Sequence, residues 1–125
     1  MSENILGDRL TERIIGCCFA VHRELGPGFN EKIYSNALQI QLKKELICFV
    51  GEKEFVVRFD DTVVGKFRCD LLIEDTVIVE LKSVTGYQPK LFQNQLISYL
   101  KASKIKTGLL INFGNTGCEI KRLSV

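Results

Sequence analysis

The chain has 125 residues, a length that suits one domain of ordinary size covering residues 1–125. Hydrophobic residues make up 46% and charged residues 26% of it, which excludes a disordered chain, and the net charge of +2 is too small to indicate nucleic-acid binding by itself. No apolar run approaches the roughly 18 residues needed to span a membrane, and no secretory leader is recognisable. We therefore expect a cytoplasmic protein without a membrane partner.

Helical periodicity runs through the first third of the chain. Residues 8–25 carry apolar side chains at helical spacing. His22, near the end of this segment, is predicted to be a surface or capping residue, and the alternative is a direct catalytic role. The same spacing resumes over residues 29–46, where Asn30 is a suitable N-cap and Glu31 falls in the first turn, favoured there by the helix dipole. The apolar stripe predicted for this second helix comprises Phe29, Ile33, Ala37 and Ile40, with Tyr34 and Leu38 beside it.

The remaining segments predict strands around one further helix. The expected elements are a hairpin of residues 49–59 and 63–73, a third strand at Val77–Lys82, a helix over residues 89–103, and two strands at residues 107–113 and 118–125. The order is thus ααβββαββ. A strand–helix–strand crossover places Leu81 and Leu110 in parallel strands, so the fold class is α/β (α+β) with a central mixed sheet flanked by helices. The last strand is expected at an edge.

The stretch from Cys69 to Lys82 contains the candidate chemistry. A turn at residues 74–76 pairs Ile73 with Val77, and this register places Asp70 opposite Glu80 on one face, about 5 Å apart at Cβ. Neighbouring carboxylates repel each other unless a cation lies between them, and hard oxygen ligands suit Mg²⁺ or Mn²⁺. Lys82, on the same face, could orient a water or stabilise an oxyanion. The alternative is a salt-bridged hairpin in which Lys82 neutralises Asp70 or Glu80 and no cavity remains.

Two further observations bear on the site. Gln95 and Tyr99 are four residues apart and share one side of the third predicted helix. Gln95 either joins a local hydrogen-bond network or reaches a phosphate or a metal-bound water. The five cysteines show no C-x-x-C spacing, so a zinc site is not expected, and most of them are interpreted as small core residues in a reducing cytosol. Basic residues that weakly suggest a phosphate-facing side, or simply a solvated surface, are Lys82, Lys90, Lys101, Lys104, Lys106, Lys121 and Arg122.

These residues resemble a known superfamily. Asp70, then Glu80-Leu81-Lys82, then a helix with Gln95-x-x-x-Tyr99 looks like the PD-(D/E)XK nuclease superfamily, whose core has a similar order of elements. More narrowly, Gly28-Phe29-Asn30-Glu31-Lys32-Ile33-Tyr34 matches the signature of the GxxExxY proteins. Residues 21–28 and 108–114 resemble other blocks of the same group, so the resemblance extends over about residues 9–123. Cys69 stands where the superfamily name would place proline, a residue that many members lack.

The resemblance implies a metal-dependent nuclease. Asp70 and Glu80 would be metal ligands, and Glu31 would be a third acid completing the site. Lys82 would position the nucleophilic water, while Gln95 and Tyr99 would lie near substrate or metal. The implied cofactor is Mg²⁺ or Mn²⁺, and the implied reaction is hydrolysis of phosphodiester bonds in DNA or RNA.

The alternative is a non-catalytic module that retains the nuclease fold and binds nucleic acid or protein. Because the chain carries little beyond a minimal core, a homodimer is a further expectation.

Overall fold

The structure is a computed structural model that describes residues 2–125, with the side chains of residues 9–125; Met1, included in the expected domain, lies outside it. The helices are α1 (Ser2–Leu25), α2 (Glu31–Lys44) and α3 (Lys90–Ser103). The strands are β1 (Phe49–Gly51), β2 (Glu54–Phe59), β3 (Thr62–Arg68), β4 (Leu71–Ile73), β5 (Val77–Lys82), β6 (Thr107–Asn112) and β7 (Glu119–Ser124). No helix within the described residues is both long and apolar enough to cross a membrane.

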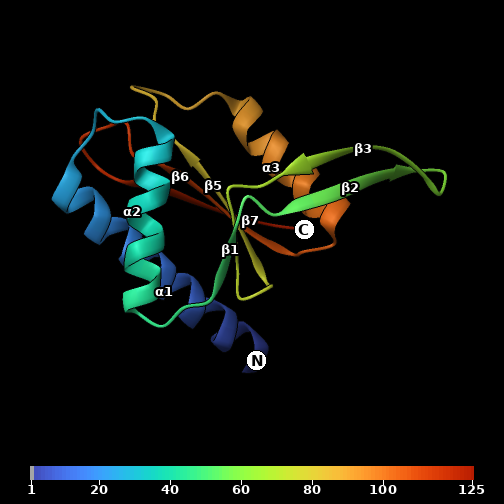
Figure 1. Cartoon of the computed structure of the whole chain (residues 1–125), viewed down its shortest axis with the longest axis horizontal. Helices are drawn as coiled ribbons and strands as arrows, with labels where there is room; N and C mark the ends of the chain where they lie inside the picture. Colours follow the sequence, from blue (N-terminus) through green and yellow to red (C-terminus); the bar gives the residue numbers. More distant parts are fainter. Residues whose placement is uncertain (1) are drawn as a thin grey trace.

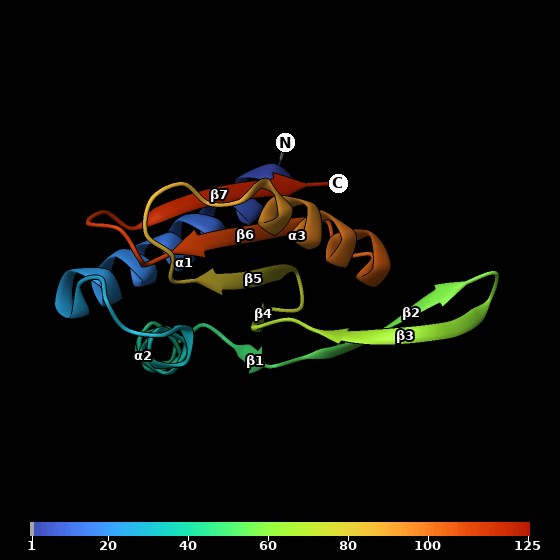
Figure 2. The same cartoon turned by 90° about the horizontal axis from the view of Figure 1, so that it is seen from above.

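A central sheet separates two layers (Figures 1 and 2). Within the described residues its strand order is β1-β4-β5-β6-β7; β5 and β6 are parallel and the other neighbours antiparallel. Helices α1 and α2 cover one face, while α3 and the β2–β3 pair lie on the other (Figure 1). This is the predicted α/β fold with a mixed sheet, and β7 is at an edge as expected.

Alternation along the central strands builds a core on each face. Val79 and Leu81 of β5 pack toward α1 and α2, whereas Ile78 packs toward α3. Because strand side chains alternate between faces, Glu80 and Lys82 share the face of Ile78 and point toward the α3 layer. Each fully buried aliphatic side chain stabilises the fold by about 1.5–3 kcal/mol, so this alternation fixes the direction of Glu80.

The long hairpin predicted over residues 49–73 is divided between two sheets. Glu52 adopts a left-handed backbone conformation (φ 51°) and turns the chain out of the central sheet after β1. Pairing continues through the break, because the Glu52 N–H donates to the Asp70 carbonyl at 2.9 Å and the Cys69 N–H donates to the Lys53 carbonyl at 3.0 Å. Strands β2 and β3 then form their own ribbon, which projects from the body (Figure 2). The prediction of one uninterrupted hairpin is therefore corrected, and Asp70 lies at the break.

The buried face of α2 also differs from the prediction. Its buried side chains are Tyr34, Leu38 and Leu42, whereas Phe29, Ile33 and Ile40 of the expected stripe are exposed. Both sets have helical spacing, so the periodicity identifies the helix but does not select the face. The N-cap is as predicted, because the Asn30 side chain accepts the N–H of Ile33 at 3.1 Å.

His22 is buried rather than on the surface, with 8% of its area exposed. Its Nε2 lies 3.0 Å from the carbonyl oxygen of Asn115, and its ring stacks against Phe113. The partner is 93 residues away in sequence, so the local pattern around His22 contains no sign of this contact. The contact joins the end of α1 to the turn between β6 and β7.

Candidate active site

The β4–β5 hairpin sets the register of the two central carboxylates. Ile73 pairs with Val77 and Leu71 with Val79, as predicted from the turn length. Glu74 and Asp75 occupy the turn with φ of 52° and 59°, and the Thr76 N–H closes it on the Ile73 carbonyl at 3.0 Å. One residue before β4, this register brings Asp70 opposite Glu80.

The carboxylates of Asp70 and Glu80 each bind the main chain of the opposite strand. The Asp70 N–H donates to Glu80 Oε2 at 2.8 Å, and the Leu81 N–H donates to Asp70 Oδ2 at 2.7 Å. These two bonds take the place of ladder hydrogen bonds directly before β4 begins at Leu71. Within the described residues the second oxygen of each carboxylate accepts no hydrogen bond. Both acids are therefore held in place with one oxygen left over.

Burial and mutual repulsion make it costly for Asp70 and Glu80 to be ionised at the same time. The Glu80 side chain is only 6% exposed, and burial, followed by the charge of Asp70, raises the pKa of Glu80 to about 7. Burial also raises the pKa of Asp70, although the hydrogen bond from Leu81 and the charge of Lys82 oppose the shift. A divalent cation would favour the ionised form of both groups.

Lys82 does not form the ion pair that the salt-bridged alternative requires. Its Nζ lies 4.4 Å from the centroid of the Phe92 ring. Within residues 9–125 no salt bridge joins Lys82 to Asp70 or Glu80, although its charge lowers the pKa of both acids. The charge of the ammonium group thus acts on both acids, but the group forms no ion pair with either of them.

Asp70 lines a hollow of about 580 Å³ between α2 and the end of β1. The residues lining it are Glu31, Lys32, Ser35, Asn36, Gln39, Gly51, Glu52 and Asp70. Glu31 is exposed there, and its charge is one of the causes that raise the pKa of Glu80. Sequence reasoning missed Glu52, whose charge raises the pKa of Asp70. In the sequence, Glu52 could have been noticed from its position directly after Gly51, between two short strand-like runs.

The arrangement fits a divalent cation through two ligands of the chain. The free oxygens of Asp70 and Glu80 are hard donors of the kind that Mg²⁺ and Mn²⁺ accept, and Mg²⁺ sites often combine one or two carboxylates with substrate phosphates. No group of three His, Cys, Asp or Glu side chains in the described part of the chain is arranged to hold a metal ion. Glu31 therefore faces the same hollow but is not placed as a third ligand.

The segment from Gly28 to Tyr34 has a structural explanation. Gly28 has a φ of 116°, a conformation that favours glycine. The hydroxyl of the buried Tyr34 donates to the Gly26 carbonyl and accepts the N–H of Phe29 at 3.3 Å, while its ring stacks on Phe113 at 4.5 Å. Gly28 and Tyr34 thus fix the turn before α2, and this turn directs Glu31 toward the hollow.

The two predicted residues of α3 are placed differently from each other. Tyr99 is half-buried and stacks on Phe67 of β3 with ring centroids 4.1 Å apart. The pKa of Tyr99 is raised by burial and then by the charges of Glu80 and Asp70, so the charges of both carboxylates act on its hydroxyl. Gln95 is exposed and makes no hydrogen bond within the described residues. The structure therefore joins Tyr99, but not Gln95, to the Asp70–Glu80 pair.

Comparison with known proteins agrees with this architecture. Residues 8–123 match the PD-(D/E)XK nuclease superfamily. The crystal structure of SSO0001 is similar with a TM-score of 0.60 and 21% identity, over 74% of this chain and 48% of that chain, so the match spans about half of SSO0001. Among curated proteins no match is found. The family match covers nearly the whole chain, and the fold carries the acid–acid–lysine set on adjoining strands. The chain belongs to the PD-(D/E)XK nuclease superfamily.

Proposed function

We propose that this protein is a metal-dependent nuclease that hydrolyses phosphodiester bonds of DNA or RNA, and that it belongs to the GxxExxY group within the superfamily. The observation that carries the proposal is the Asp70–Glu80 pair with a free oxygen on each acid, next to a lysine without an ion-pair partner. Its five free cysteines suit the reducing cytoplasm, which we propose as its location. We also propose that the protein forms a homodimer. A mass equal to one chain, measured by light scattering, would contradict this proposal.

Each residue of the candidate site would have a separate role in the reaction. Asp70 and Glu80 would hold Mg²⁺ or Mn²⁺, and Glu31, from the opposite wall of the hollow, would contribute through a water or by a change of rotamer. When bound, the metal would supply Lewis acidity, lowering the pKa of a water and offsetting charge on the scissile phosphate. Lys82 would orient the attacking water and stabilise negative charge with its ammonium group. Tyr99, fixed by its stack on Phe67, would contact the substrate, and Gln95 would reach it from the exposed side of α3.

The test is cleavage of labelled single- and double-stranded DNA and RNA with Mg²⁺, with Mn²⁺ and with EDTA. Glu80→Gln keeps an acceptor for the Asp70 N–H, and Lys82→Ala removes only a half-buried side chain, so both variants should fold. We expect each to lower the cleavage rate by about 10²-fold or more, the usual effect of removing one electrostatic contribution.

Asp75→Asn is the matched control, because it removes an exposed carboxylate at the turn of the same hairpin, where asparagine tolerates positive φ. It should cleave at the wild-type rate. Activity that is unchanged in both Glu80→Gln and Lys82→Ala would refute the proposed roles.

A second candidate is a module that binds without cutting. One observation favours it: Asp70 and Glu80 have a structural role in holding the main chain, so the fold alone would retain them. This candidate predicts binding of nucleic acid that does not depend on metal and no cleavage of any of the four substrates. Metal-dependent cleavage abolished by Lys82→Ala would exclude it.

A further inference from the structure

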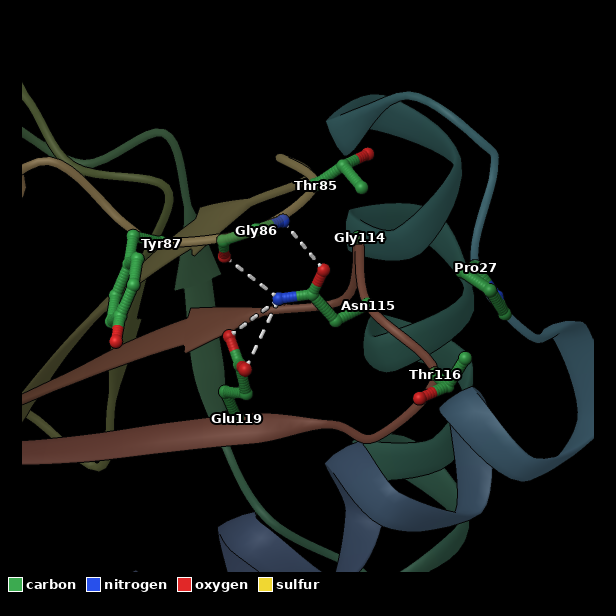
Figure 3. A pocket seen from close by; sticks show the side chains of 8 residues that line it. All are labelled: Pro27, Thr85, Gly86, Tyr87, Gly114, Asn115, Thr116 and Glu119. Carbon is green, nitrogen blue, oxygen red and sulfur yellow. Dashed lines mark hydrogen bonds between the residues drawn. The ribbon is translucent and has the colours of Figure 1, made fainter.

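The loop that joins β5 to α3 is held by two asparagine side chains, Asn112 at the end of β6 and Asn115 in the turn that follows it. Asn112 Oδ1 accepts the N–H of Val84 at 2.9 Å and Asn112 Nδ2 donates to the Val84 carbonyl at 2.9 Å. Asn115 does the same with Gly86, at 2.8 and 2.9 Å (Figure 3). Each amide therefore binds both polar groups of one loop residue, as a neighbouring strand would.

Glu119 fixes the orientation of both asparagines. Its carboxylate accepts Asn112 Nδ2 at 3.0 Å and Asn115 Nδ2 at 3.1 Å. At the start of the same loop the Ser83 hydroxyl donates to the Phe29 carbonyl at 2.6 Å. The loop directly after Lys82 is thus attached to the β6–β7 turn and to the turn before α2, and it is not a free connection.

This fixed loop presents Tyr87 entirely to solvent. The side chain is fully exposed, at 101%, on a backbone held at Gly86, the preceding residue. A chain spans at most about 3.6 Å per residue, so the Cα atoms of Tyr87 and Lys82 lie within about 18 Å, a distance bridged by a few nucleotides. An aromatic ring held this close to the candidate site is suited to contact a bound substrate.

Beside Tyr87 is a hollow of about 570 Å³, within the range of small-molecule sites. Pro27 and Thr116 lie across the Asn115–Glu119 network from Tyr87 (Figure 3). The hydroxyls of Thr85 and Thr116 are exposed and make no hydrogen bond within the described residues. The hollow therefore combines an aromatic ring, a proline and unused hydroxyl groups.

The charge of the hollow selects which part of a nucleotide would enter it. The carboxylate of Glu119 lines it, and no Lys or Arg does, so a phosphate would be repelled. A nucleobase is uncharged, offers a face that stacks on an aromatic ring, and carries polar edge groups that hydroxyls and a carboxylate can bind. Inside a duplex both faces of an internal base are covered by its stacked neighbours, so such a base can stack on Tyr87 only where the strand is single.

We infer that Tyr87 and the hollow beside it bind an unpaired base, so the substrate of the proposed nuclease contains a single-stranded segment. The inference rests on the proposed function, which supplies nucleic acid as the ligand, and adds that the strand leaves the Asp70–Glu80 pair along the loop toward Tyr87.

The test measures binding of a cleavage-resistant, phosphorothioate-linked oligonucleotide of about 12 nucleotides, a typical site size for a single strand, in Mg²⁺. One base is replaced by 2-aminopurine, whose fluorescence is quenched by stacking. Wild type should bind the single strand more tightly than its blunt duplex and quench the probe. Tyr87→Ala should lose about ten-fold or more in single-strand affinity together with the quenching, whereas Tyr87→Phe should keep both.

Leu91→Ala is the matched control, because Leu91 is 69% exposed at the start of α3, four residues farther along. It should bind like wild type. Single-strand binding that is equal in wild type and Tyr87→Ala, or a preference for the duplex, would overturn this inference and leave the proposed nuclease standing. Absence of any binding by wild type would overturn both.

Discussion

At the scale of single residues, the two acids of the candidate site have a structural role, and their burial has an electrostatic cost. Asp70 and Glu80 continue the β4–β5 pairing through their side chains, at 2.7 and 2.8 Å. Burial and mutual repulsion also make their ionised forms costly, as the raised pKa of Glu80 indicates. The site is thus held together by groups that would be more stable with a cation present.

This cost predicts a pH dependence of stability. The folded state binds the Glu80 proton up to a pKa of about 7, above the ordinary value of 4.5, so between these values it holds more protons than the unfolded state. Stability should therefore fall as pH rises through that window. In EDTA, urea denaturation at about pH 5 and about pH 8 should show wild type losing of the order of 1–3 kcal/mol more than Glu80→Gln.

Glu74→Gln is the comparison variant, since Glu74 is an exposed glutamate of the same hairpin whose carboxylate also accepts a main-chain N–H, from Cys48 at 2.8 Å. Equal pH dependence in wild type and Glu80→Gln would show that Glu80 is not the group responsible.

At the scale of elements, the contact between the β6–β7 turn and the loop after β5 depends on a missing side chain. A Cβ built on Gly114 would lie 2.3 Å from the carbonyl oxygen of Val84 and 2.4 Å from its nitrogen. Gly114→Ala should therefore push the loop away and lower the free energy of unfolding by about 1–3 kcal/mol, as other overpacked positions do. Amide hydrogen exchange at Gly86 should also become faster.

Gly117 provides the control in the same turn. A Cβ there would meet nothing within 4 Å, so Gly117→Ala should leave both stability and exchange at Gly86 close to wild type. If the two alanine variants behave alike, the close approach of Gly114 to Val84 is not what holds the loop.

Local patterns predicted those features that depend on local geometry. The length of the turn after Ile73 was enough to place Asp70 opposite Glu80, and the crossover through α3 was enough to make β5 and β6 parallel. The face of α2 could not be predicted, because two sets of apolar residues have helical spacing and only the packing of Tyr34 on Phe113 distinguishes them.

Features that depend on residues far away in the sequence were also missed, because a local pattern contains no information about such contacts. The burial of His22 requires the carbonyl of Asn115, and the position of the loop after β5 requires the side chains of Asn112 and Asn115. The departure of β2 and β3 from the central sheet depends on the conformation of Glu52, a residue type that gives no warning of a positive φ. The partners of His22 and of the loop after β5 are 28 to 93 residues away in sequence.

At the scale of the whole molecule, metal binding should stabilise the fold, because only the folded chain brings Asp70 and Glu80 together. At a free metal concentration about 100 times the dissociation constant, the gain is about 2.7 kcal/mol, which is several degrees in the unfolding midpoint. Thermal unfolding with Mn²⁺ should show this increase in wild type, and a larger one with a single-stranded oligonucleotide whose phosphates complete the shell.

Asp70→Asn keeps an acceptor for the Leu81 N–H but removes a charge, so its midpoint should respond less to Mn²⁺. Asp75→Asn, outside the hollow, should respond like wild type. An equal increase in Asp70→Asn and wild type would place the metal elsewhere on the molecule.

The bonds from Asp70 and Glu80 to the main chain also bear on how such a site would decay in a lineage that no longer cuts nucleic acid. Selection for folding alone would go on retaining both acids, because each accepts a main-chain hydrogen bond next to the start of β4. Lys82 has no comparable structural role, since among the described residues its ammonium group lies over the Phe92 ring and forms no salt bridge. The lysine should therefore be the first of the three to be lost. A relative that keeps both acids and has replaced the lysine is then expected to be folded and inactive.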